Sequence, residues 1–169
     1  MAMTTSTEKV KFPLAIATFF GSGLSPVAPG TVGSLAALPL AYGLLSTPTW
    51  AAPLVITVLF FMGVWASNVI ETVLERHDAS LIVIDEVVGQ CLVVVLLDVF
   101  LGGLVEWPSL LALSFIGFRL FDIVKPWPVG WIDRWVEGGL GVMLDDVVAA
   151  LLTVPFIAGG YLLYALTAI

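Results

Sequence analysis

The sequence is poor in charge, in cysteine and in histidine. Charged residues make up 11% of its 169 residues, whereas 60% are hydrophobic. So little polar surface cannot cover a water-soluble globule, which excludes an ordinary soluble domain. The single Cys91 excludes an internal disulfide, and the single His77 excludes chemistry that needs two histidines. The composition instead indicates a protein that resides in a membrane.

Basic residues are also scarce. Thirteen acidic residues stand against six basic ones, which gives a formal net charge of -7. This balance argues against nucleic acid as a partner and against simple electrostatic attraction of an anionic ligand. Cations are therefore the ligands that the overall charge favours.

Long apolar runs indicate helices, because the hydrocarbon core offers the backbone no hydrogen-bond partners and the alternating pattern of barrel strands is missing. We expect one all-α integral-membrane domain over residues 1–169, a polytopic helical bundle of about five spans. The segment 12–20 is too short to span and is expected to form an interfacial or re-entrant half-helix. It superficially resembles a signal peptide, but no small-residue cleavage site follows. The spans are expected at 32–45, 50–70, 87–105, 109–121 and 147–169.

The placement of basic residues predicts the orientation. With a cytoplasmic N-terminus, every Lys and Arg falls on the cytoplasmic side, and the opposite loops at 46–49 and 102–108 contain neither residue type. We therefore expect a multi-pass protein whose N-terminus and acidic helix ends face the cytoplasm. The basic residues are Lys9, Lys11, Arg76, Arg119, Lys125 and Arg134.

Acidic residues adjoin the apolar runs in three places: Asp85 with Glu86, Asp122, and Asp145 with Asp146. A carboxylate inside a bilayer costs about 2.5–3.5 kcal/mol, so such residues usually face a cavity, a partner or a metal. Grouped at one end of a small bundle, these acids would repel one another unless a cation lay between them. Hard oxygen ligands suit Mg²⁺. The three acidic sets are therefore candidate ligands for such an ion.

An alternative interpretation of Asp85 and Asp145 is purely structural. An aspartate at the start of a helix caps free N–H groups and complements the helix dipole. A cap needs only one acid, and each of these positions is doubled by a neighbouring carboxylate. The doubling favours ligands over caps.

Three basic residues follow or accompany the acids along the chain: Arg119, Lys125 and Arg134. Arg119 and Asp122 lie on one helical face, so an ordinary ion pair is the alternative interpretation of that pair. Together the three cations could hold an anionic group. Carboxylates, a metal and basic residues in one site are the usual arrangement for phosphoryl chemistry.

The segment 21–34, GSGLSPVAPGTVGS, supplies glycines and hydroxyl groups. Ser22, Ser25 and Thr31 are candidate substrate-binding residues because such a segment can cradle an anion. A turn followed by a helix cap is the alternative. The glycine-rich stretch 136–142 is either a linker or a second phosphate cradle. His77 stands in a charged connection and is more typical of a surface histidine than of a catalytic base.

Three motifs, GSGLSPVAPGTVGS, IDEVVGQ and RLFDIVKPWPVGWIDRWVEGGLGVMLDDVVA, together resemble the phosphatidylglycerophosphatase A family of bacterial membrane enzymes. The resemblance implies a Mg²⁺-dependent phosphatase of the bacterial cytoplasmic (inner) membrane. Such an enzyme removes the terminal phosphate of phosphatidylglycerophosphate and yields phosphatidylglycerol and inorganic phosphate in phospholipid biosynthesis.

Roles for the residues follow from this reaction as a hypothesis. The predicted Mg²⁺ ligands are Asp85, Glu86, Asp145 and Asp146. Asp122 positions the attacking water or the metal, the three basic residues bind the phosphate, and Asp133 is a second-rank candidate. The predicted catalytic residues are Asp85, Glu86, Asp122, Asp145 and Asp146. Direct attack by an aspartate through a phospho-enzyme is left open. So are a small membrane transporter and a non-catalytic lipid-binding subunit with a buried cation site.

Overall fold

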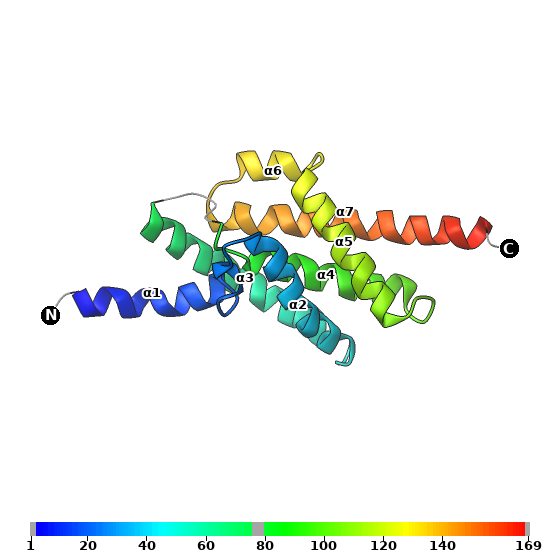
Figure 1. Ribbon diagram of the computed structural model, residues 1–169, viewed down its shortest axis with the longest axis horizontal. Helices are drawn as coiled ribbons and strands as arrows, with labels where there is room; N and C mark the ends of the chain where they lie inside the picture. The colour runs from blue at the N-terminus through cyan, green and yellow to red at the C-terminus, as the bar shows by residue number, and fades with distance from the viewer. Residues whose placement is uncertain (1–2, 76–79, 168–169) are drawn as a thin grey trace.

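The computed structural model describes residues 3–75 and 80–167, and within these residues the fold is entirely helical (Figure 1). His77 lies outside the described residues. Among them there are seven α-helices and one short 3₁₀ helix. The elements are α1 (Met3–Ala17), the 3₁₀ helix η1 (Ser22–Leu24), α2 (Pro29–Leu45), α3 (Ala51–Leu74), α4 (Ile84–Leu101), α5 (Trp107–Val124), α6 (Val129–Trp135) and α7 (Gly138–Thr167).

Each of the five apolar runs forms a long helix, which confirms the all-α fold. In the described part of the chain, α3, α5 and α7 are long and apolar enough to cross a membrane. By contrast, α2 has 17 residues, and α4 includes three carboxylates among its 18 residues. Large apolar side chains remain exposed on the outer faces, for example Phe61 on α3 and Ile116 on α5. Such faces suit lipid contact and support membrane association.

The last long helix starts earlier than the sequence predicts. The glycine-rich stretch 136–142 was expected to be a loop because glycine disfavours helices. Instead α7 begins at Gly138, and a Cβ on Gly139 would lie 2.3 Å from the carbonyl oxygen of Val64 on α3. The backbone N–H of Gly139 also donates to Asn68 Oδ1 at 2.8 Å. These glycines let α7 pack closely on α3, and this packing overrides their low helix propensity.

Two further boundaries differ from the expectation. Of the predicted half-helix 12–20, residues 12–17 form the last part of a longer helix, α1, and residues 18–20 lie in the turn that follows it. Phe19 and Phe20 then adopt left-handed backbone conformations and turn the chain toward η1. The short helix α6 occupies a segment that was expected to be part of a loop.

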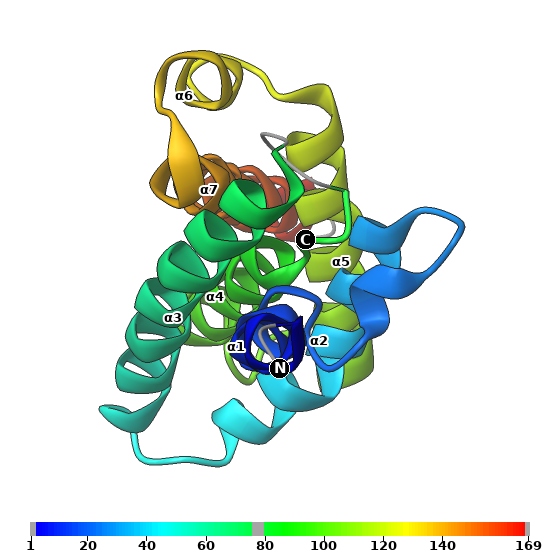
Figure 2. The ribbon, with the colours of Figure 1, turned by 90° about the vertical axis from the view of Figure 1, so that its left-hand side faces the viewer.

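Helix α4 forms the centre of the bundle and packs against α2, α3, α5 and α7 (Figure 2). Most of its residues are buried, including Val87, Gln90 and the free Cys91. Because α4 starts at the end of the bundle where α2 and α7 also start and α5 finishes, the N-terminal parts of three helices meet the C-terminal part of a fourth. This meeting point holds the acidic residues.

Candidate active site

A cavity of about 500 Å³ opens where the starts of α2, α4 and α7 meet the end of α5. All five predicted catalytic acids line it, although they come from three different helices. Its charged and hydroxyl-bearing lining residues are Thr31, Ser80, Asp85, Glu86, Arg119, Asp122, Lys125, Asp133, Asp145 and Asp146. The fold therefore collects most of the chain's candidate functional groups in one place.

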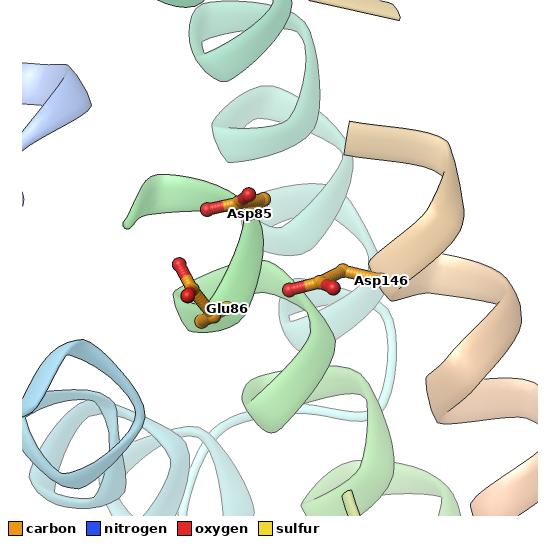
Figure 3. Close-up of side chains that lie close together, drawn as sticks. All are labelled: Asp85, Glu86 and Asp146. Carbon is orange, nitrogen blue, oxygen red and sulfur yellow. The ribbon is translucent and has the colours of Figure 1, made fainter. Parts of the chain in front are cut away.

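Three of the acids form a tight cluster, which we call the carboxylate triad: Asp85, Glu86 and Asp146. One carboxylate oxygen of each lies within 4.8 Å of the others. Asp146 reaches from α7 toward the two acids on α4 (Figure 3). Asp85 Oδ1, Glu86 Oε2 and Asp146 Oδ2 are buried and have no hydrogen-bond partner among the described residues. A cation between these three acids would offset their mutual repulsion, and an all-oxygen donor set fits Mg²⁺.

The triad acids are not helix caps. Val83 occupies the N-cap of α4, and no side chain caps that helix. Asp85 and Glu86 do lie in its first turn, where the helix dipole favours negative charge. Asp145 and Asp146 lie well inside α7, which starts at Gly138, so the capping interpretation of Asp145 is wrong.

Asp145 lines the cavity but stands outside the triad. Its Oδ2 accepts a hydrogen bond from Lys125 Nζ at 2.8 Å, and its Oδ1 accepts from the backbone N–H of Asp146 at 3.0 Å. Both oxygens are therefore occupied. Of the four predicted metal ligands, the structure brings three together and gives the fourth a basic partner.

Arg119 lies between two of the acids. Its Nη1 is 2.5 Å from Asp122 Oδ2 and 3.6 Å from Glu86 Oε1, and it donates to Ser34 Oγ at 3.5 Å. The expected ion pair with Asp122 one turn away is present, but it lines the cavity and is largely buried instead of extending into solvent. Nη1 of the guanidinium is thus paired with acids, whereas its Nε has no hydrogen-bond partner among the described residues.

Lys125 ends α5 in a left-handed conformation (φ 45°) and connects three helices. Its Nζ pairs with Asp133 of α6 and with Asp145 of α7. Burial alone would lower the pKa of Lys125, but its hydrogen bonds to the two carboxylates and their charges outweigh burial and raise that pKa above its ordinary value. Lys125 therefore stays charged and forms a fixed wall of the cavity.

The remaining predicted binding residues separate into two groups. Thr31, in the first turn of α2, lines the acidic cavity. The Ser22 hydroxyl donates to the Thr18 carbonyl at 3.0 Å, the Ser25 hydroxyl donates to the Val27 carbonyl at 2.9 Å, and neither residue lines the cavity. Short hydroxyl side chains in turns commonly satisfy nearby backbone groups in this way. Arg134 lines a neighbouring cavity instead.

Two contributors on α2 were not among the predicted site residues. A Cβ on Gly30 would lie 2.0 Å from Glu86 Oε1, so only glycine leaves room for that carboxylate. Ser34, fully buried, receives the Arg119 hydrogen bond. The signal was present in the spacing, because residues 30, 31 and 34 lie on one face of a helix.

Comparison with known proteins adds independent evidence. The family model described as Phosphatidylglycerophosphatase A matches residues 15–160. The chain is 38% identical to Phosphatidylglycerophosphatase A of Escherichia coli K12, over 82% of this chain and 77% of that protein. It is 39% identical to the protein of the same name from Haemophilus influenzae Rd, over 82% of each chain.

A third relative carries a different name. A Bacteroides thetaiotaomicron protein, provisionally named a phosphatidylinositol-3-phosphatase, is 38% identical over 86% of this chain and 91% of its own length. No solved structure gives a significant match. The family match covers most of the sequence and includes every residue of the cavity described above. The chain belongs to the phosphatidylglycerophosphatase A family.

Proposed function

We propose that this membrane phosphatase removes the terminal phosphate of phosphatidylglycerophosphate and releases phosphatidylglycerol and inorganic phosphate in phospholipid biosynthesis. Family membership and two relatives of that name support the assignment. The observation that carries it is the buried carboxylate triad with Arg119 beside it at one end of an apolar bundle. A lipid phosphomonoester can reach such a site while its acyl chains stay in the bilayer.

We further propose that the triad holds Mg²⁺. Its three unsatisfied carboxylate oxygens support this proposal. Asp145 lies in the same cavity, where it pairs with Lys125. When bound, a divalent ion neutralises phosphate charge and makes water a better nucleophile. The residues of the chain supply the rest: the acids fix the site, and the basic groups orient the anion.

Arg119 and the first turn of α2 are the proposed partners of the terminal phosphate. Helix N-termini present free N–H groups, and the start of α2 at Gly30 and Thr31 lines the cavity. Arg119 adds fixed positive charge aimed at the same space. Asp122, oriented by its ion pair with Arg119, is placed to position the attacking water and accept its proton.

We also propose that α2, α3, α4, α5 and α7 all cross the bacterial inner membrane and that the cavity faces the cytoplasm. The orientation is supported by the absence of Lys and Arg from the loops 46–49 and 102–108 at the opposite end of the bundle. Burial of α4 inside the bundle accounts for a spanning helix that carries carboxylates.

Removal of divalent metal is expected to stop the reaction. Purified protein in detergent with Mg²⁺ should release phosphate from phosphatidylglycerophosphate, release should fall to background with a chelator, and added Mg²⁺ should restore it. Full activity in chelator would contradict the metal proposal. No release from this lipid in Mg²⁺ would contradict the proposed reaction, and a parallel assay on phosphatidylinositol 3-phosphate tests the alternative substrate.

Replacing Gly30 with alanine is expected to reduce turnover by about a hundredfold without unfolding the protein. The new methyl group would occupy the position of Glu86 Oε1, and the flexible Glu86 side chain can move away at the cost of its place in the triad. Gly43→Ala is the matched control, because a Cβ there meets no atom within 4 Å. Equal activity of the two variants would show that the position of Glu86 does not matter.

A further inference from the structure

A second cavity, of about 240 Å³, adjoins the acidic one. Lys125 lines both cavities, so they meet at this residue. The second cavity is built almost entirely by the segment that contains α6, and its lining is aromatic and basic: Lys125, Trp127, Gly130, Trp131, Arg134 and Trp135. It contains none of the acidic residues of the first cavity.

Arg134 differs from Arg119 and Lys125 in having no acidic partner among the described residues. Arg119 and Lys125 are each held by two acids, at Asp122 and Glu86 and at Asp133 and Asp145. Among the described residues no hydrogen bond or ion pair engages the Arg134 guanidinium. The second cavity therefore has a positive charge that no acid within residues 3–75 and 80–167 neutralises.

Three exposed tryptophans line this cavity. Trp127, Trp131 and Trp135 recur at intervals of four residues, and their exposures are 83%, 53% and 70%. Trp131 and Trp135 lie on α6 and Trp127 just precedes it. Exposed indoles grouped in this way are typical of the headgroup layer, where an apolar ring with a polar N–H is most stable. An arginine among such rings is well suited to the phosphate of a lipid headgroup.

We propose that the second cavity binds the phosphodiester of the lipid substrate; this inference rests on the proposed function. Phosphatidylglycerophosphate carries a terminal phosphomonoester and, one glycerol unit away, a phosphodiester attached to its diacylglycerol. With the monoester beside the triad, the glycerol unit passes Lys125 and the diester lies against Arg134. The acyl chains then leave along the exposed tryptophans into the bilayer.

This arrangement gives Arg134 a role in specificity and not in chemistry. The diester stays away from the carboxylate triad, so only the terminal ester is hydrolysed. A lipid or soluble phosphate that lacks a diester at this distance loses the Arg134 contact. Charge-assisted hydrogen bonds of this kind change binding by about tenfold or more.

Arg134→Gln tests the inference through binding constants. We expect KM for phosphatidylglycerophosphate in zwitterionic micelles to rise about tenfold with kcat within about twofold of wild type. Inhibition by inorganic phosphate, which needs only the acidic cavity, should be unchanged. Arg134→Lys should recover part of the affinity. Lys11→Gln removes the same charge from α1, which lines neither cavity, and should leave KM unchanged.

Several results would overturn the proposed phosphodiester subsite at Arg134. KM unchanged in Arg134→Gln would remove the subsite, and an equal rise in Lys11→Gln would indicate general attraction to anionic lipid. A parallel loss of inhibition by inorganic phosphate would place Arg134 on the terminal phosphate. Native mass spectrometry can count the phosphatidylglycerol molecules that the protein retains, and it needs no turnover. This measurement tests the phosphodiester subsite even if wild type releases no phosphate and the proposed function fails. Equal retention by wild type and Arg134→Gln would then reject it.

Discussion

Asp146→Asn is expected to lower phosphate release by about a thousandfold while making the metal-free protein more resistant to heat. Asp146 is 2% exposed, and its Oδ2 has no partner among the described residues. In the absence of a cation, its charge is repelled by Asp85 and Glu86 within the triad. The amide removes that repulsion, but it also removes the only triad ligand that α7 contributes.

Thermal unfolding in detergent separates this outcome from simple damage. Mg²⁺ should raise the Tm of wild type, since a ligand that binds only the folded state stabilises it, and should raise that of Asp146→Asn little or not at all. Asp98→Asn is the matched control, because Asp98 lies near the other end of α4 and does not line the acidic cavity. A variant that keeps a tenth of wild-type turnover, or responds to Mg²⁺ as wild type does, would remove Asp146 from the proposed site.

The sequence predicts the helices and the acids of the site for the same physical reason. Apolar runs without charge must lie in the membrane or the core, so a carboxylate beside such a run is costly unless it has a function. The sequence therefore identifies five acids as members of one group, and all five line one cavity: Asp85, Glu86, Asp122, Asp145 and Asp146. The position of the cluster at one end of the bundle follows from the alternating direction of the helices.

Apart from the ion pair of Arg119 with Asp122, the sequence did not predict which charged groups pair. Adjacent residues on a helix diverge by about 100°, and the face that turns inward depends on packing. Asp145 thus pairs with Lys125 while Asp146 joins the triad. The early start of α7 was not predicted either. Gly139 is helical because it packs closely on α3, and local helix propensity does not reflect that contact.

The hydroxyl-rich segment 21–34 shows the same limit. Ser22, Ser25 and Thr31 look alike in the sequence, yet only Thr31 lies at the start of a helix that faces the cavity. The serines satisfy backbone carbonyls in their own turn. Composition identifies the segment as a source of polar groups, and the turn that redirects the chain decides which of them reach the site.

Arg119→Gln is expected to reduce turnover by about a thousandfold and to destabilise the protein by about 3 kcal/mol. The substitution leaves Asp122 and Glu86 without their basic neighbour in a cavity that already holds Asp146. Arg119→Lys retains the charge and the pairing with Asp122 but loses the planar fork that holds phosphate. It should keep nearly all of the stability and still lose about tenfold in turnover.

The double variant Arg119→Gln with Asp122→Asn distinguishes phosphate binding from a purely structural ion pair. Removing both partners should restore part of the Tm, because the uncompensated carboxylate of Asp122 is gone and only Glu86 still lacks its basic neighbour. Calorimetric titration with inorganic phosphate in Mg²⁺ provides the second readout and needs no turnover. Asp122→Asn alone should still bind phosphate, whereas the double variant should not. If both bind it equally, Arg119 serves only to hold Asp122 in place, and the terminal phosphate is oriented by the start of α2.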